Sequence, residues 1–148
     1  MKILVAIDGS AASMQALHHV LGLLHGGLRA SLVLGNVQQP PSLYEVVAVH
    51  DVAGIEAMRA AAGADLLAAA EALVEARGCD YESEVAGGAP QHVLVEMAER
   101  YGAASIVLGA QGMGTRPGVG LGSVVLDVLA HSKVPVTVVP LPAFAADA

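Results

Sequence analysis

Two short segments carry the residues best suited to binding an anionic ligand. One is Asp8-Gly9-Ser10, and the other is the stretch 109–123, which has glycine at positions 109, 112, 114, 118, 120 and 122 and ends in Gly122-Ser123. Glycine lets the backbone approach a ligand closely, so that exposed N–H groups form a nest for an anion. A helix that begins after Gly122 adds free N–H groups and a favourable dipole. A loop that is merely flexible or tightly turned is the alternative interpretation.

The established phosphate-loop and nucleophile motifs do not occur in this sequence. A Walker A loop needs a lysine beside its last glycine, but the only lysines are Lys2 and Lys133. Neither G-x-G-x-x-G nor G-x-S-x-G is present, which argues against a dinucleotide fingerprint and a hydrolase elbow. No His or Lys lies in the motif around Asp8, so we assign no catalytic residue.

The composition indicates an acidic globular protein. The 148 residues are 55% apolar and 14% charged, with a formal charge of −7, which argues against nucleic acid or an anionic membrane as partner. Aromatic residues are too scarce for a base-stacking platform. The single Cys79 excludes an internal disulfide, and the apolar run before Asp8 is too short for an export signal. We therefore expect a cytoplasmic protein.

The elements that would position these segments alternate between strand and helix. The sequence predicts strands over 3–7, 30–37, 80–86, 105–108 and 136–139 and helices after Ser10, after 52, after Pro90 and after Gly122. This order is typical of an α/β fold, and we predict a doubly wound five-stranded parallel sheet of strand order 3-2-1-4-5 with helices on both faces. One domain would span 1–142, followed by a short tail, 143–148.

Apolar spacing also predicts which side of two helices is buried. In the long second helix the stripe is Ile55, Met58, Ala62, Leu66, Ala69, Leu73 and Ala76, with Arg59 outside it. In the last helix Leu121, Val124, Val125, Val128 and Leu129 are expected on one side. The segment 42–52 has no clear period and is predicted to be a long loop.

Four features in the same order resemble nucleotide-binding universal stress proteins. The first is the signature Gly109-x2-Gly112-x9-Gly122-Ser123, and the second is the opening strand that ends in Asp8. The others are Gly88-Ala89-Pro90 before the third helix and the closing segment Val134-Pro135-Val136-Thr137-Val138-Val139-Pro140. The similarity extends over nearly the whole chain.

The resemblance implies an adenine nucleotide, usually ATP, beyond the carboxyl ends of the first and fourth strands. Asp8 would accept hydrogen bonds from the ribose hydroxyls. The remaining nucleotide-binding residues fall into three groups: Ala6, Ile7 and Val37 around adenine with Leu108 behind it; Gly109, Gln111 and Gly112 along one side of the phosphates; and Gly122, Ser123 and Val124 as donors on the other side.

Charge balance extends this expectation to a metal ion. A triphosphate carries about four negative charges, whereas the glycine loop supplies one cation, Arg116, and the helix dipole about half a charge. We therefore expect Mg²⁺ or Mn²⁺ bridged by the phosphates, without direct protein ligands. Gln111, where relatives often have a basic residue, and Pro117-Gly118 favour the alternative of a nucleotide-free protein-interaction module.

The last strand predicts the assembly. An apolar strand bracketed by prolines suits the edge of a sheet, where pairing with a second copy would cover it. The resemblance likewise implies a homodimer through this strand, around Val136 and Val138. A monomer whose edge is blunted by proline is the alternative. A nucleotide-dependent stress-response or signalling module is the function we expect, and a slow ATPase is the less favoured one.

Overall fold

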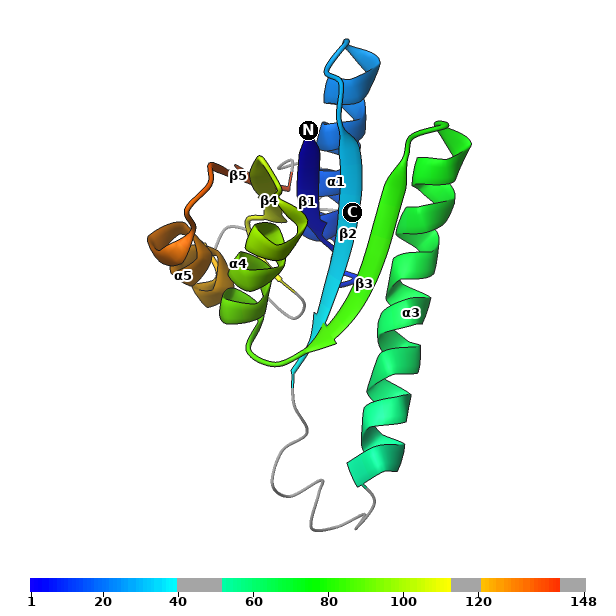
Figure 1. Cartoon of the computed structure of the whole chain (residues 1–148), viewed down its shortest axis with the longest axis vertical. Helices are drawn as coiled ribbons and strands as arrows, with labels where there is room; N and C mark the ends of the chain where they lie inside the picture. Colours follow the sequence, from blue (N-terminus) through cyan, green and yellow to red (C-terminus); the bar gives the residue numbers. More distant parts are fainter. Residues whose placement is uncertain (40–51, 113–120, 142–148) are drawn as a thin grey trace.

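A computed structural model describes residues 1–39, 52–112 and 121–141 (Figure 1). Within these ranges five parallel strands form one sheet in the order β3-β2-β1-β4-β5, which confirms the predicted fold. The strands are β1 (Lys2–Ala6), β2 (Ser31–Gln38), β3 (Tyr81–Gly87), β4 (Ser105–Gly109) and β5 (Val136–Val139). The helices are α1 (Ala11–His25), α3 (Val52–Ala76), α4 (Pro90–Tyr101) and α5 (Ser123–His131).

Strand β1 lies in the middle of the sheet and is covered on both faces. Ile3 and Val5 pack with α1 and α3 in one core, while Leu4 packs with α4 and α5 in the other. Leu4 is paired in register with Val33 of β2 and Ile106 of β4, so the centre of the sheet is apolar on both sides. This double burial explains why the sequence of β1 is a continuous apolar run without alternation.

Helix α1 begins where the sequence predicts it, directly after the turn that follows β1. The Ser10 hydroxyl accepts a hydrogen bond from the backbone N–H of Ser13 at 3.1 Å, which satisfies one of the free donors of the first turn. The helix ends at Gly26. Its histidines, His18, His19 and His25, are exposed.

The buried face of α3 differs from the predicted stripe. Ile55 is buried as expected, but Met58 is 73% exposed, and Ala62, Ala69 and Ala76 are also exposed. The helix instead buries Gly63, Leu67, Ala70 and Val74 against the sheet. Gly63 decides the orientation, because a Cβ atom there would lie 2.5 Å from Val85 Cγ1, so the helix comes closest to the sheet at its smallest residue.

Helix α5 also exposes residues that the sequence analysis placed on its buried side. Val125 and Val128 are buried and Val124 is half-buried, but Leu121 is 46% and Leu129 44% exposed. Leu121 precedes the helix, which begins at Ser123, and Leu129 lies at the margin of the face that Val124, Val125 and Val128 share at 100° per residue. The predicted side was therefore too wide, and the described surface of α5 is partly apolar.

Several expectations lie outside the described residues. They concern most of the predicted loop 42–52, the arginine at position 116, Pro117-Gly118 and the tail 143–148. The helix that follows the loop begins at Val52. No described helix combines the length and the apolarity that crossing a membrane would require.

Candidate functional site

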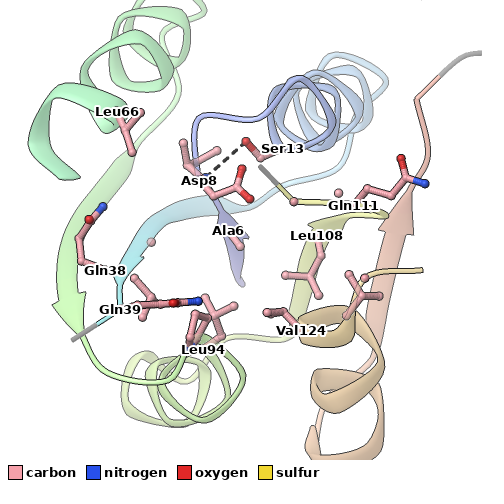
Figure 2. A pocket seen from close by; sticks show the side chains of 18 of the residues that line it. Ala6, Asp8, Ser13, Gln38, Gln39, Leu66, Leu94, Leu108, Gln111 and Val124 are labelled. Atoms are coloured by element: carbon pink, nitrogen blue, oxygen red, sulfur yellow. Dashed lines mark hydrogen bonds between the residues drawn. The ribbon is translucent and has the colours of Figure 1, made fainter. Parts of the chain in front are cut away.

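A pocket of about 560 Å³ opens beyond the carboxyl ends of β1, β2 and β4 (Figure 2). The chain order reverses between β1 and β4, because β1 is followed by β2 on one side and by the much later β4 on the other. Ligands of doubly wound sheets bind in the crevice at such a reversal. The volume lies within the range of roughly 300–1,000 Å³ usual for small-molecule sites.

The structure brings all of the predicted nucleotide-binding residues together around this pocket. Its lining includes the end of β1, the end of β2, the end of β4, Gln111 and Gly112 beyond it, and the start of α5. The members named in the sequence analysis are Ala6, Ile7, Asp8, Val37, Leu108, Gly109, Gln111, Gly112, Gly122, Ser123 and Val124. Segments far apart in the sequence thus meet at one place.

Asp8 is held by the turn that starts α1. Its Oδ1 accepts a hydrogen bond from the N–H of Ser10 at 2.8 Å, and its own N–H donates to the Ser13 hydroxyl at 3.4 Å. Its other oxygen, Oδ2, faces Gly112, where a Cβ atom would lie 3.1 Å away. One carboxylate oxygen therefore stabilises the turn while the other faces the loop across the pocket.

Two glycines of the signature, Gly109 and Gly122, lie in different surroundings. Gly109 is required by packing within the protein, since a Cβ atom there would lie 2.6 Å from the carbonyl carbon of Ala12 in α1. At Gly122 the nearest atom of the described residues to a Cβ atom would be the Ala110 carbonyl oxygen, at 3.8 Å. The fold itself therefore has room for a side chain at position 122, and a glycine there leaves that room to the pocket.

The start of α5 forms one end of the pocket. Gly122 is the N-cap residue, with φ −68° and ψ 158°, and it has no side chain with which to cap the helix. Its own N–H donates to Ala110 at 3.0 Å, which ties the helix start to the end of β4. The first-turn N–H groups, including those of Ser123 and Val124, give this end of the pocket a positive potential.

The rest of the wall is apolar with a few amides. Figure 2 shows Ala6 and Leu108 near the centre of the view, Leu94 beside Gln39 below them, and Leu66 of α3 at the upper left. A cavity with an apolar wall and a helix N-terminus suits a ligand that has both a flat apolar part and an anionic part.

Sequence reasoning missed part of the lining. The residues are Ser13, Gly35, Gln38, Gln39, Arg59, Leu66, Pro90, Leu94 and Val125. Pro90 belongs to the Gly-Ala-Pro motif noted in the sequence, which was the available signal. Arg59 was expected on the outer side of α3; it is half-buried, and among the described lysines and arginines it is the one that lines the pocket.

The sequence matches a known protein family over most of its length. The sequence model of the universal stress protein family matches residues 1–140. The chain belongs to the universal stress protein family. A comparison with curated protein sequences gave no match to this chain.

Solved structures of the family share its fold. The universal stress protein UspA of Lactobacillus plantarum is 23% identical, with a TM-score of 0.81 over 94% of this chain and 97% of its own. A family protein of Arabidopsis thaliana with AMP bound is 19% identical, with a TM-score of 0.70 over 98% and 94%. A universal stress protein in complex with cAMP is 28% identical, with a TM-score of 0.68 over 94% and 96%.

Proposed function

We propose that this universal stress protein binds an adenine nucleotide, with ATP as the preferred ligand, in the pocket between β1, β2, β4 and α5. Related structures hold AMP and cAMP, which supports an adenine nucleotide in this family member. The observation that carries the proposal is the unfilled space at Gly122, at the start of α5 and beside the glycine loop. Among the described residues nothing requires a glycine there, whereas a phosphate lying against the first-turn N–H groups does.

The ligand would lie with its phosphates toward α5 and its base toward β2. Gly109, Gln111 and Gly112 would border the phosphates on one side, and the N–H groups at Ser123 and Val124 would donate from the other. The apolar surfaces of Ala6, Ile7, Val37 and Leu108 would enclose the adenine. Between them, Asp8 would accept hydrogen bonds from the ribose hydroxyls through Oδ2, the oxygen that faces the loop.

A divalent cation would accompany the triphosphate. The described side chains that line the pocket include one cation, Arg59, and one carboxylate, Asp8, whose charges offset each other. Among the described groups, the helix dipole, which is worth about half a charge, would then be the main one that opposes four phosphate charges. Mg²⁺ or Mn²⁺ bound by phosphate oxygens and water would supply the missing positive charge.

The protein would act as a homodimer joined through β5. The carbonyl oxygens of Pro135, just before β5, and of Val139 accept from Ile106 of β4 and from Ala110 directly after β4, so alternate residues along β5 face the sheet. The main-chain groups of Val136 and Val138 therefore point away from β4. A second copy of β5 paired with them would cover this edge.

As a whole, the protein would be a cytoplasmic module whose stress-response or signalling contacts depend on the bound nucleotide. Titration calorimetry with ATP tests the proposal, in buffer with Mg²⁺ and in buffer with EDTA. We expect saturable binding that weakens at least tenfold in EDTA, because Mg²⁺ offsets phosphate repulsion. Adenosine should bind equally well in both buffers. A folded protein that gives no binding heat with either ligand would instead indicate a nucleotide-free interaction module, and steady release of ADP would indicate an ATPase.

A further inference from the structure

A buried amide near the end of β2 links the backbone of β1 to the pocket wall. The side chain of Asn36 is 1% exposed, and its Nδ2 donates to the carbonyl oxygen of Ile7 at 2.8 Å. Its Oδ1 accepts from Nε2 of Gln38 at 2.7 Å. A backbone carbonyl can only accept, so Asn36 must present its nitrogen to Ile7 and its oxygen to Gln38.

Helix α3 packs against the side chain of Asn36. A Cβ atom on Gly63 would lie 2.7 Å from Asn36 Oδ1 and 2.5 Å from Val85 Cγ1. The helix backbone at Gly63 therefore packs closely on the amide oxygen, and the buried Asn36 side chain is enclosed between α3 and the sheet. If the Gln38 amide turned over, its oxygen would face the oxygen of Asn36, and both would lose a hydrogen bond.

Gln38 lines the pocket on the side away from α5. Figure 2 shows it on the wall with Gln39 and Leu66, whereas Gln111 and Val124 lie on the opposite side. With the phosphates at α5, this wall faces the base. After its bond to Asn36, the Gln38 amide retains one N–H donor and its carbonyl oxygen for a ligand.

We propose that the Asn36–Gln38 amide pair makes the pocket selective for 6-aminopurines over 6-oxopurines. The inference rests on the proposed nucleotide binding. Adenine presents an amino donor beside a ring-nitrogen acceptor, a pair that one glutamine amide matches. Hypoxanthine presents a carbonyl acceptor in place of the amino group and, at N1, a donor in place of the acceptor. A freely turning glutamine could serve either base by rotating its amide, whereas Gln38 is held in one orientation by the Ile7 carbonyl.

Calorimetry with ATP and ITP tests this selectivity on the full chain in Mg²⁺. We expect wild type to bind ATP about tenfold more tightly than ITP, the scale of one lost hydrogen bond. Gln38→Met, which keeps the length of the side chain, should weaken ATP binding and bring the ratio close to one. Asn36→Ser should tighten ITP binding, because the Gln38 amide is then able to turn. Gln15→Met, the same exchange on α1 away from the pocket, should leave the ratio unchanged.

Each outcome is decisive. A wild-type ratio near one, with both nucleotides bound, would overturn the selectivity and leave the proposed function standing. A tenfold ratio that persists in Gln38→Met would assign the selectivity to another group and overturn the role of the amide pair. If neither nucleotide binds to the folded wild-type protein, the proposed function fails and the inference fails with it. Thermal unfolding of each variant establishes that it is folded; if Asn36→Ser does not fold, Gln38→Met alone decides.

Discussion

Gly112 lies against the Oδ2 atom of Asp8, so closely that a Cβ atom at position 112 would be 3.1 Å from that oxygen. The two residues follow β1 and β4, which are neighbours in the sheet although they are far apart in the sequence. The contact brings a carboxylate acceptor next to a segment of bare backbone. A sugar that bridges the two would have its hydroxyls beside Oδ2 and its phosphate beside the loop.

This relationship predicts how the protein distinguishes riboses. In Asp8→Asn the Oδ1 atom can still accept from Ser10, but the oxygen that faces Gly112 is replaced by an amide nitrogen. We expect the preference for ATP over 2′,3′-dideoxy-ATP to fall about tenfold, because a hydrogen bond to a charged acceptor is worth about 1.5–3 kcal/mol and only part of it is lost. Competition titrations with the two nucleotides measure the preference.

The exposed Asp80 provides the control for that experiment, since Asp80→Asn removes the same charge away from the pocket. Its preference should equal that of the wild type. An unchanged preference in Asp8→Asn would show that the ribose does not contact this carboxylate.

The outward-facing main chain of β5 predicts the assembly. Val138→Pro removes an N–H group that points away from β4, so the bonds between β4 and β5 are retained while pairing with a second copy is blocked. We expect a dimer for the wild type and a monomer for Val138→Pro in sedimentation equilibrium. Val138→Ala shortens the same side chain but keeps the N–H, and it should remain a dimer. A monomeric wild-type protein would contradict pairing through β5.

A charged pair outside the pocket predicts a pH dependence of stability. Arg100 on α4 donates two hydrogen bonds to the Glu84 carboxylate on β3, at 2.6 and 2.7 Å. These bonds hold the pKa of Glu84 below its usual 4.5, against a smaller opposing effect of burial. Because the folded-state pKa is the lower one, the stabilisation is complete above the unfolded pKa and disappears as pH falls through the folded value.

Arg100→Gln tests this sign. The pair is partly exposed, so we expect a loss of about 0.5 kcal/mol in unfolding free energy at neutral pH and a smaller loss at about pH 3. Urea unfolding at the two pH values measures the difference. Lys133→Gln breaks the more exposed pair with Glu99 and should cost less at neutral pH. An equal loss at both pH values for Arg100→Gln would indicate a packing effect of the arginine stem instead.

The sequence predicted the structure best where a local pattern is typical of a single kind of element. The apolar run before Asp8 predicted the central strand, and Ser10 predicted the helix cap that the structure contains. It failed on α3, because alanine on every side makes the apolar stripe ambiguous. The actual face is set by Gly63, whose close approach to β3 depends on tertiary packing that no local pattern contains.

The pocket likewise contains residues that the sequence predicted and residues that only the structure places there. Its glycines and Asp8 stand out in the sequence because turns and anion nests need such residues. Arg59 looked like an ordinary charge on the solvent side of a helix, and only the packing of α3 over the end of β2 places it beside the pocket. Asn36 sits in the middle of an apolar strand, and its role becomes visible only when Ile7 and Gln38 are found on either side of its amide.

The most direct test of nucleotide binding is the ultraviolet spectrum of freshly purified protein, followed by denaturation and chromatography of the released small molecules. With no Trp and three Tyr, the chain absorbs weakly, so a bound adenine should dominate near 260 nm. We predict released ATP or another adenine nucleotide from the wild type and none from Gly122→Val, whose side chain would occupy the space beside the Ala110 carbonyl. Gly22→Val, the same exchange at an open position of α1, should retain the nucleotide. A wild-type protein without adenine absorbance and without a thermal shift on addition of Mg-ATP would contradict the account.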